Sequence, residues 1–400
     1  MGYNIWSACP RIPITDLLKF IVDNRGKTVP TASYGHKLIA TNCVTNNTLF
    51  PVYEKVRYLS DQTYHTWFRA HPIPGDILFV NKGTPGRVCM VPDPVDFCIA
   101  QDMIALRADD SKIYNKYLFA VLRSREIQQQ IYNTSVGDVI PHFKKQFMEQ
   151  ILIPVPDRKI QEIIGDFYYA LSYKIEHNKK INVNLEQQAI VIYKEWFVDN
   201  SVATKWPLVM LDSITSLVSR GITPKYAIDS KQIVLNQKCI RDHCIDISLA
   251  RVHTPKAITE KWLQYGDLLI NSTGEGTLGR AAQVWFEPEN MTVDSHVTIV
   301  RPQTQLLRFY IGLWGITHES EIEALHTGST GQTELPRDRL KTMELRLPDD
   351  GSLAKFNSVI QPMVSGVMAN QRENMNLANI RDALVPKLMS GEINISDIQL

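Results

Sequence analysis

The sequence has no hydrophobic run that could cross a membrane, because no window approaches the roughly 18 consecutive apolar residues that a span requires. The first residues, MGYNIWSACPRIP, also contain no long apolar stretch of the kind that a signal peptide has. Cysteine is scarce, with 6 among 400 residues and no C-x-x-C pair. We therefore expect a cytoplasmic protein whose thiols are reduced.

The sequence also gives little sign of a metal site. Cys239, His243 and Cys244 lie close together in the sequence, but no second cluster has the spacing of metal ligands. We therefore expect the cysteines to be small buried side chains and not metal ligands. The net charge of +1 neither supports nor excludes a nucleic-acid partner, since basic residues can gather on one face of a neutral protein. A chain of 400 residues exceeds one ordinary core and should form at least two domains.

Catalytic motifs are missing as well. The sequence contains no G-x-S-x-G, no H-E-x-x-H, no N/D-P-P-Y/F and no complete P-loop pattern. Acidic residues lie beside prolines in VPDPVD and LPDD, but no E-x-K partner follows at the spacing of a nuclease. These absences predict a chain without catalytic residues.

The main positive feature is a tandem duplication. The segment PGDILFVNKGTPGR (74–87) resembles YGDLLINSTGEGTLGR (265–280), and VIPHFKKQFMEQILIPVPD (139–157) resembles ELPRDRLKTMELRLPDD (334–350). Aligning Pro141 with Pro336 gives an offset of 195 residues in the second pair, against 191 between the Gly-Asp pairs of the first. Two shorter segments are also similar between the copies: RGKTVP (25–30) to RGITP (220–224), and NCV (42–44) to KCI (238–240). Because the offset stays near 193, the chain should contain two copies of one unit.

Each copy has two parts. About 150 residues of short apolar runs, broken by Gly, Pro, Asn and Asp, predict mostly strands and loops with some helix. A polar stretch with apolar residues at steps of three and four follows and predicts a long helix. The expected apolar stripes are Ile160, Ile164, Phe167, Leu171, Ile175, Ile181, Leu185, Ile192 and Trp196 in the first helix, and Leu353, Phe356, Ile360, Val364, Val367, Met375, Leu377, Ile380, Leu384 and Leu388 in the second.

A helix of 40 residues is about 60 Å long, and one apolar stripe on it needs a partner. We therefore predict that the two helices pack on each other as an antiparallel pair, with Asn178 and Asn370 near the seam fixing the register. Pro362 removes one backbone donor and is a candidate kink. The alternative is two separate amphipathic helices, each lying on its own domain.

These patterns predict an α+β fold with two repeated globular domains separated by two long helices packed as an antiparallel coiled coil. The expected boundaries are 1–156 for the first globular domain, 157–200 for the central helix, 201–350 for the second globular domain and 351–400 for the C-terminal helix.

One glycine motif imitates a dinucleotide site. Gly274, Gly276 and Gly279 spell G-x-G-x-x-G after an apolar run, and Asp294 lies where a ribose-binding acid is expected. A dinucleotide loop must open a helix, yet RAAQVWFEPEN follows and is typical of a strand. The corresponding NKGTPGR of the first copy lacks the motif, so a hairpin turn is the preferred interpretation. An enzyme that binds a nucleotide at this loop remains an alternative.

The layout resembles the specificity (S) subunit of type I restriction–modification enzymes. The run LVPKLMSGEI (384–393) is similar to that family's C-terminal helix end, while the GD-[IL]-L…GR segment and LIPVPD before a helix are similar to its target-recognition domains. The resemblance covers essentially the whole chain and rests on order, duplication and spacing, since no single motif is highly specific.

The resemblance implies that each globular domain reads one half of a bipartite double-stranded DNA target. It further implies that the helices set the distance between the halves and dock two methyltransferase (modification) subunits, which motor–nuclease (restriction) subunits then join. S-adenosylmethionine, ATP and magnesium belong to those partners, so we expect no cofactor and no catalytic residue on this chain. Half-sites one DNA turn apart are separated by about 34 Å, which a helix near 60 Å can span.

The duplication also sorts the candidate DNA contacts. The two halves of the target should differ, so residues that read bases should differ between the copies, whereas shared residues such as Arg87 and Arg280 should support the scaffold or contact phosphates. Ordinary solvated loops are the alternative for each residue, and a non-DNA scaffold with two binding modules is the alternative function. The candidates where the copies diverge are Lys55, Arg57, Tyr64, His65 and Arg69 in the first copy, and Arg241, His243, Arg251, His253 and Lys256 in the second. Further candidates around and after the glycine hairpins are Lys82, Thr134, Ser135, His142, Lys144 and Lys145, and Thr330, Gln332, Arg337 and Arg339.

Overall fold

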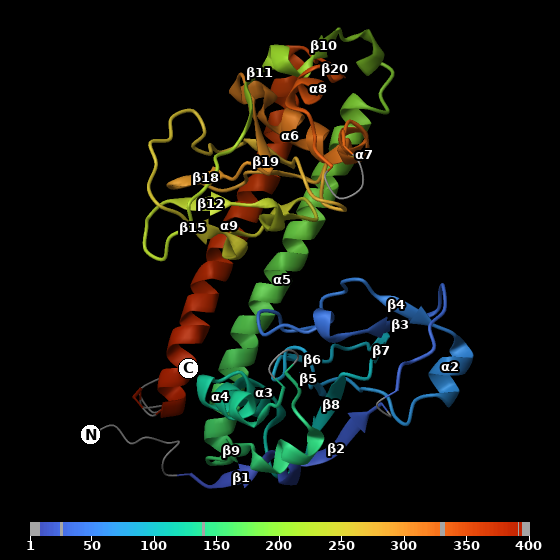
Figure 1. The fold of residues 1–400 in the computed structure, drawn as a ribbon, viewed down its shortest axis with the longest axis vertical. Coiled ribbons are helices and arrows are strands. Elements are labelled where there is room, and N and C mark those ends of the chain that lie inside the picture. The colour runs from blue at the N-terminus through green and yellow to red at the C-terminus, as the bar shows by residue number, and fades with distance from the viewer. Residues whose placement is uncertain (1–8, 25–26, 138–140, 329–332, 391, 394–400) are drawn as a thin grey trace. The chain divides into compact units, whose positions relative to one another are not determined.

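The computed structural model describes residues 9–24, 27–137, 141–328, 333–390 and 392–393. The chain divides into two compact units, which we call unit 1 (1–179 with 372–400) and unit 2 (180–371). Each unit combines one globular part with one portion of two long helices, α5 (Arg158–Phe197) and α9 (Asp350–Ser390) (Figure 1). No helix within the described ranges is both long and apolar enough to cross a bilayer.

Unit 1 contains a four-stranded antiparallel sheet in the order β2-β8-β5-β6 and a three-stranded sheet in the order β4-β3-β7. A short pair, β1 with β9, closes the globular part just before α5. The strands are β1 (Arg11–Pro13), β2 (Leu18–Asp23), β3 (His36–Ile39), β4 (Arg57–Leu59), β5 (Ile77–Val80), β6 (Val88–Met90), β7 (Phe97–Ile99), β8 (Met103–Ala108) and β9 (Leu152–Pro154). The short helices are α2 (Asp61–Thr66), α3 (Asn115–Leu122) and α4 (Arg125–Thr134).

Unit 2 repeats this topology with sheets in the orders β11-β19-β16-β17 and β15-β12-β18, and with the closing pair β10 and β20. An additional hairpin, β13 with β14, has no counterpart among the described strands of unit 1. The strands are β10 (Leu208–Met210), β11 (Thr215–Arg220), β12 (Ile233–Leu235), β13 (Ile240–Arg241), β14 (Cys244–Ile245), β15 (Arg251–Val252), β16 (Leu268–Asn271), β17 (Ala281–Gln283), β18 (Met291–Val293), β19 (Val297–Pro302) and β20 (Glu344–Arg346). The short helices are α6 (Arg308–Thr317), α7 (Glu319–Ala324) and α8 (Arg337–Lys341).

The repeat extends to irregular details. In both four-stranded sheets the first strand carries a bulge one residue after its start, at Lys19 in β2 and at Ser216 in β11. The two copies differ mainly around the small sheets, where unit 1 has α2 after β4 and unit 2 has the β13–β14 hairpin before β15. The scaffold is therefore repeated, and the local elements on it are not.

The central strands β5 and β16 are buried on both faces, which explains their continuous apolar sequences. Ile77 and Phe79 of β5 join a core with α3, α4 and α5, while the alternating Leu78 and Val80 join a second core with β3 and β7. Figure 1 shows α3 and α4 beside α5 in unit 1. In unit 2, the corresponding core of β16 and α6 includes residues of both long helices, such as Phe356 of α9.

Within each unit the long helices pack as an antiparallel pair. In unit 1, the guanidinium of Arg381 lies 5.6 Å from the ring centroid of Tyr168. In unit 2, the rings of Phe356 and Phe197 have centroids 4.7 Å apart. Because higher numbers on α9 meet lower numbers on α5, the pairing is antiparallel, as predicted, and the alternative of two separate helices is wrong.

Asparagines occupy the seam in both units. In unit 1, Asn178 is fully buried and its amide nitrogen donates to Asn374 Oδ1 at 2.9 Å and to Glu373 Oε2 at 2.7 Å. In unit 2, Asn370 donates to Asn182 Oδ1 at 2.8 Å. The sequence placed Asn178 and Asn370 near the seam, and each has a different asparagine as its partner.

Some predicted stripe residues lie outside the seam. Met375 and Ile380 are exposed, whereas Arg381 is buried between the helices. The apolar pattern was therefore misleading in the C-terminal half of α9, because polar residues such as Arg381 fill the interface there. Pro362 is exposed, and α9 continues through it as one helix of 41 residues.

Candidate nucleic-acid interface

The two glycine-rich segments form β-hairpin turns. Gly83 and Gly86 connect β5 to β6, with φ angles of 86° and 88°. Gly274, Gly276 and Gly279 connect β16 to β17, with φ angles of 96°, 71° and 85°. These left-handed conformations favour glycine and explain why the turn is rich in it.

The structure gives the glycine motif none of the parts of a dinucleotide site. The strand β17 follows Gly279 where a phosphate-binding helix would have to begin. Asp294, the candidate ribose acid, is buried and accepts a hydrogen bond from the backbone of His296 at 2.9 Å. The predicted hairpin is confirmed.

The arginine after each turn is accessible. Arg87 is exposed, and no acidic side chain in the described part of unit 1 pairs with it. Arg280 is half-buried and donates from Nη2 to the carbonyl of Gly276 at 2.8 Å, closing its own turn. The two arginines therefore share a position but not a contact.

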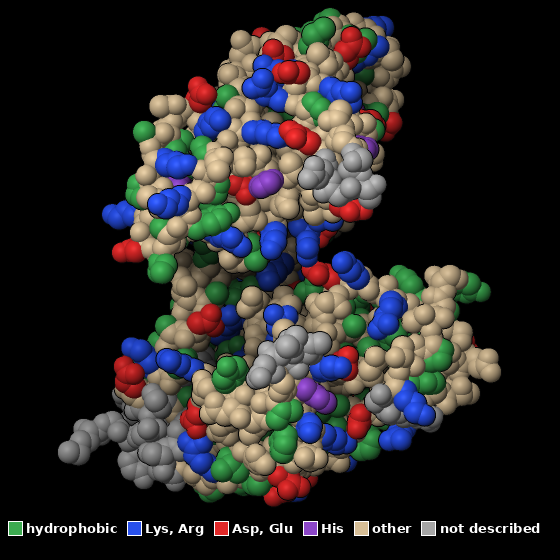
Figure 2. Space-filling view, in the orientation of Figure 1, with side chains coloured by type: hydrophobic (Ala, Val, Ile, Leu, Met, Phe, Trp, Pro, Cys, Tyr) green, Lys and Arg blue, Asp and Glu red, His purple; other side chains and the backbone are tan. Residues whose placement is uncertain are grey.

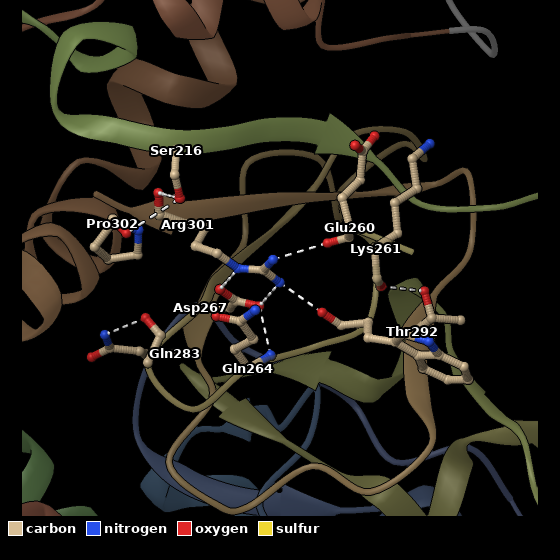
Figure 3. A network of polar contacts seen from close by, with 11 residues as sticks. Ser216, Glu260, Lys261, Gln264, Asp267, Gln283, Thr292, Arg301 and Pro302 are labelled. Atoms are coloured by element: carbon tan, nitrogen blue, oxygen red, sulfur yellow. Dashed lines mark hydrogen bonds and ion pairs between the residues drawn. The ribbon is translucent and has the colours of Figure 1, made fainter. Parts of the chain in front are cut away.

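Each Gly-Asp pair supplies a buried carboxylate that the sequence did not explain. In unit 1, Arg107 donates to both oxygens of Asp76, at 2.9 and 3.0 Å, and the hydrogen bond raises the pKa of Arg107. In unit 2, Arg301 donates to both oxygens of Asp267 at 2.8 Å (Figure 3). Burial raises the pKa of Asp267, and Arg301 counteracts that effect. Both pairs are structural and tie the hairpin strand to its neighbour.

The base-reading candidates of unit 1 gather around α2. Ser60 caps this helix, and the ring of Tyr64 stacks between His36 and His71 with centroid distances of 4.1 and 4.2 Å. Asp61 contacts His36 at 3.0 Å and His65 at 3.5 Å, and the contact with His36 lowers the pKa of Asp61. Lys55, Arg57, His65 and Arg69 are exposed, and Tyr64 is half-buried.

The candidates of unit 2 do not form one surface. His243 lies in the turn of the β13–β14 hairpin and contacts Glu186 of α5 at 2.9 Å and Glu319 of α7 at 3.7 Å. Hydrogen bonds to these two carboxylates raise the pKa of His243 to about 10. His243 therefore binds the β13–β14 hairpin to α5 and α7. His253 is fully buried and, contrary to expectation, is not available to DNA in this structure.

The remaining candidates of unit 2 are exposed. Arg251 lies over the ring of Tyr226, with 4.7 Å between the guanidinium carbon and the ring centroid. Lys256 donates from Nζ to the carbonyl of Thr223, and Arg241 is exposed in β13. Tyr226 was missed from the sequence, although an aromatic residue beside lysine in a Gly-Pro-rich segment could have indicated it.

The residues after the hairpins require a corrected alignment. Phe143 donates its backbone N–H to Asn81, and Leu335 donates to Ser272 in the same way, at 2.7 and 2.8 Å. Phe143 and Leu335 are therefore equivalent, at an offset of 192, and the sequence alignment of Pro141 with Pro336 is displaced by three residues. The corrected register makes Lys145 the equivalent of Arg337.

Two of the charged candidates in these segments contact a carboxylate. Lys145 contacts Asp23 at 3.1 Å and Arg337 contacts Asp338 at 3.3 Å, while Lys82 and Lys144 are exposed. Figure 2 shows lysine and arginine interspersed with acidic side chains on the face in view, so charge alone does not mark an interface on that face. Thr134, Ser135 and His142 are half-buried and Arg339 is exposed, whereas Thr330 and Gln332 lie outside the described residues. Within the described ranges, no three His, Cys, Asp or Glu side chains are grouped to hold a metal ion.

Comparison with known proteins gives consistent results. The family model described as "Type I restriction modification DNA specificity domain" matches residues 16–187. The chain is 23% identical over 353 residues to the MjaIX type I restriction enzyme specificity subunit of Methanocaldococcus jannaschii, covering 81% of this chain and 79% of that protein. It is 20% identical over 401 residues to the HindI specificity subunit of Haemophilus influenzae, covering 80% of this chain and 86% of that protein.

A solved structure shares the fold. The crystal structure of the type I restriction–modification S subunit from M. genitalium superposes with a TM-score of 0.57 at 13% identity, covering 94% of this chain and 95% of that one. The predicted fold class, with two repeated globular parts and two long antiparallel helices, is confirmed.

Proposed function

We propose that the chain is a specificity subunit of a type I restriction–modification enzyme, like the relatives and the family model that it matches, and that each of its globular parts reads one half of a bipartite DNA target. The observation that supports this most is a repeated scaffold with unlike local elements. Both units have the same two sheets and the same buried Asp–Arg pair. Only unit 1 has α2 among its described elements, and only unit 2 has the β13–β14 hairpin.

This pattern suits recognition of two different half-sites. Equal scaffolds would meet the DNA backbone in equal ways, and unlike elements would contact unlike bases in the major groove. The proposed boundaries of these recognition domains are 1–156 and 201–350. Arginine, lysine and polar aromatic side chains around α2 and the small sheet of unit 2 supply suitable donors.

We further propose that α5 and α9 act as the spacer and docking element. The two helices contain 40 and 41 residues, so each is about 60 Å long and can set the distance between two recognised half-sites. Two methyltransferase subunits would dock here, and restriction subunits would join them. The chemistry and its cofactors would belong to those partners, and this chain would contribute recognition without catalysis.

A base-resolution map of methylated adenines in the host tests the proposal. The expected result is a split sequence with a constant gap, methylated only when this chain is present. A modification pattern that is unchanged on deletion of the gene would overturn the proposal. A scaffold that does not contact DNA would also show no salt-sensitive DNA binding when complexed with its partners.

A further inference from the structure

We propose that Arg57 and Arg251 are matched contacts to the DNA backbone, one in each unit, placed beside the elements that read bases. The proposal rests on the DNA-recognition function proposed above. It assigns these two residues to sequence-independent binding, whereas the divergence of the surrounding sequences would place them among the base readers.

The strand register makes the two arginines equivalent. Arg57 pairs with Leu38 across β4 and β3, and Arg251 pairs with Val234 across β15 and β12. In both units this strand lies at the edge of the small sheet, whose other two strands pair in parallel. The next backbone contact is repeated too, since Ala32 donates to Tyr58 at 2.8 Å and Ala227 donates to Val252 at 3.1 Å.

The equivalence was hidden in the sequence. The difference in residue number between equivalent positions of the two copies is 196 for β3 and β12 but 194 for β4 and β15. It changes because the segment between the two strands is two residues longer in the first copy than in the second. The surrounding letters, VRYL and ARVH, share little besides the arginine. Only the pairing partners in the sheet reveal that the same residue type recurs at the same place.

Both arginines are exposed and have no acidic partner among the described residues. Arg251 lies over the exposed ring of Tyr226. A guanidinium group stacked on a ring still directs its N–H groups outward in its own plane, where they can bind an anion. Exposed guanidinium groups on an edge strand, without a carboxylate partner, are suited to phosphate.

Other repeated cations are already engaged. Arg107 and Arg301 are bound to buried carboxylates. Lys145 and its equivalent Arg337 each contact an aspartate. Arg87 and Arg280 also lack an acidic partner among the described residues, but Arg280 is half-buried and donates to the carbonyl of Gly276. Arg57 and Arg251 differ from these pairs, because both are exposed and neither has an acidic partner in the described part of the chain.

The position of these arginines also explains how one scaffold serves two sequences. Arg57 lies three residues before Ser60, which caps α2. Arg251 follows the segment 240–250, which contains the β13–β14 hairpin. A backbone contact at the edge strand would hold each unlike element at the same depth against the DNA, so that the element can change while the docking geometry stays.

The test uses the full chain in complex with its methyltransferase subunits and duplexes containing the mapped target. Arg57→Gln, Arg251→Gln and the double variant are compared with wild type by fluorescence anisotropy over a range of salt concentrations. Lys19→Gln is the matched control, because Lys19 is an exposed cation whose equivalent in unit 2 is Ser216. Arg57→Lys and Arg251→Lys retain the charge.

Loss of one phosphate contact should lower the slope of log K against log salt by about 0.9, which corresponds to roughly 8-fold weaker binding near 0.1 M salt. The double variant should lose about twice that slope. The methylated sequence should stay the same in both halves, the lysine variants should keep most of the slope, and Lys19→Gln should behave as wild type.

Two other results would overturn the assignment. If the glutamine variants keep the wild-type slope, the arginines do not contact phosphate. If either variant alters base preference in one half of the target, that arginine reads a base. Failure of the proposed function gives a different result, in which the wild-type complex itself shows no salt-dependent binding to any duplex. Thermal unfolding of each variant establishes that a loss of slope comes from charge and not from misfolding.

Discussion

Arg301 donates two hydrogen bonds of 2.8 Å to the carboxylate of Asp267, and Arg107 donates two to the carboxylate of Asp76 in the other unit. Asp267 is 1% exposed and accepts a further hydrogen bond from the backbone of Gln264 at 2.8 Å. Arg301 also donates to the carbonyl of Glu260 (Figure 3). Its Nη2 donates to the carbonyl of Trp262 at 2.6 Å. The pair therefore anchors the loop before β16 as well as the strand.

Asp267→Asn should destabilise unit 2 strongly, by about 3–5 kcal/mol, because it leaves a buried guanidinium without its counter-ion. Asp76→Asn should cost less, since the side chain of Arg107 is 26% exposed against 12% for Arg301. Urea unfolding followed by far-ultraviolet circular dichroism, which reports on the secondary structure of both units, measures the difference. A larger loss for Asp76→Asn than for Asp267→Asn would contradict the account.

The glycine hairpin gives a second prediction. A Cβ at Gly279 would lie 2.9 Å from Glu323 Cβ and 3.0 Å from the Glu319 carbonyl oxygen, whereas a Cβ at Gly276 would meet no atom within 4 Å. Both glycines have positive φ, so alanine costs about 1–2 kcal/mol of strain at either position. Gly279→Ala should be the more destabilising of the two in the same urea experiment.

The same two variants separate a hairpin from a nucleotide site. Neither NAD nor ATP should raise the melting temperature of the wild-type chain. A nucleotide-dependent rise that Gly276→Ala abolishes would support the nucleotide-binding alternative instead.

The asparagine pairs across the helices should be coupled. Asn370→Leu should destabilise unit 2 by about 1 kcal/mol, because the Oδ1 of Asn182 loses its donor. Replacing both Asn182 and Asn370 with leucine should be nearly neutral or stabilising, since the seam then buries two apolar side chains. A double-mutant cycle measured by urea unfolding reports the coupling, and additive effects would show that the hydrogen bond does not contribute.

His243 makes the stability of unit 2 depend on pH. Its pKa is raised to about 10 by Glu186 and Glu319, compared with about 6.5 in the unfolded chain. A raised pKa gives stabilisation that is fully present below about pH 6.5 and disappears as the pH rises through about 10. The difference in unfolding free energy between wild type and His243→Gln should therefore shrink between these values. A difference that grows with pH would contradict the assignment of His243 as a bound cation.

Part of this structure could be predicted because its signal is local or periodic. The repeat, the hairpins and both long helices follow from spacing in the sequence. The partners of Asp76 and Asp267 lie 31 and 34 residues away, and no local pattern connects them. The burial of His253 and the pairing of His243 with α5 and α7 likewise depend on tertiary packing. Polar residues buried between the long helices, such as Arg381, were not predicted, because the prediction used only the spacing of apolar residues.

The central claim, that each globular part reads its own half of the target, is tested most directly by replacing residues 201–350 with a second copy of 1–156. The chain then presents two identical recognition parts on the same helices. In complex with the methyltransferase subunits, it should methylate a sequence whose two halves are identical and match the half assigned to unit 1. A base-resolution map that still contains the original second half, or two halves unrelated to the first, would contradict the account.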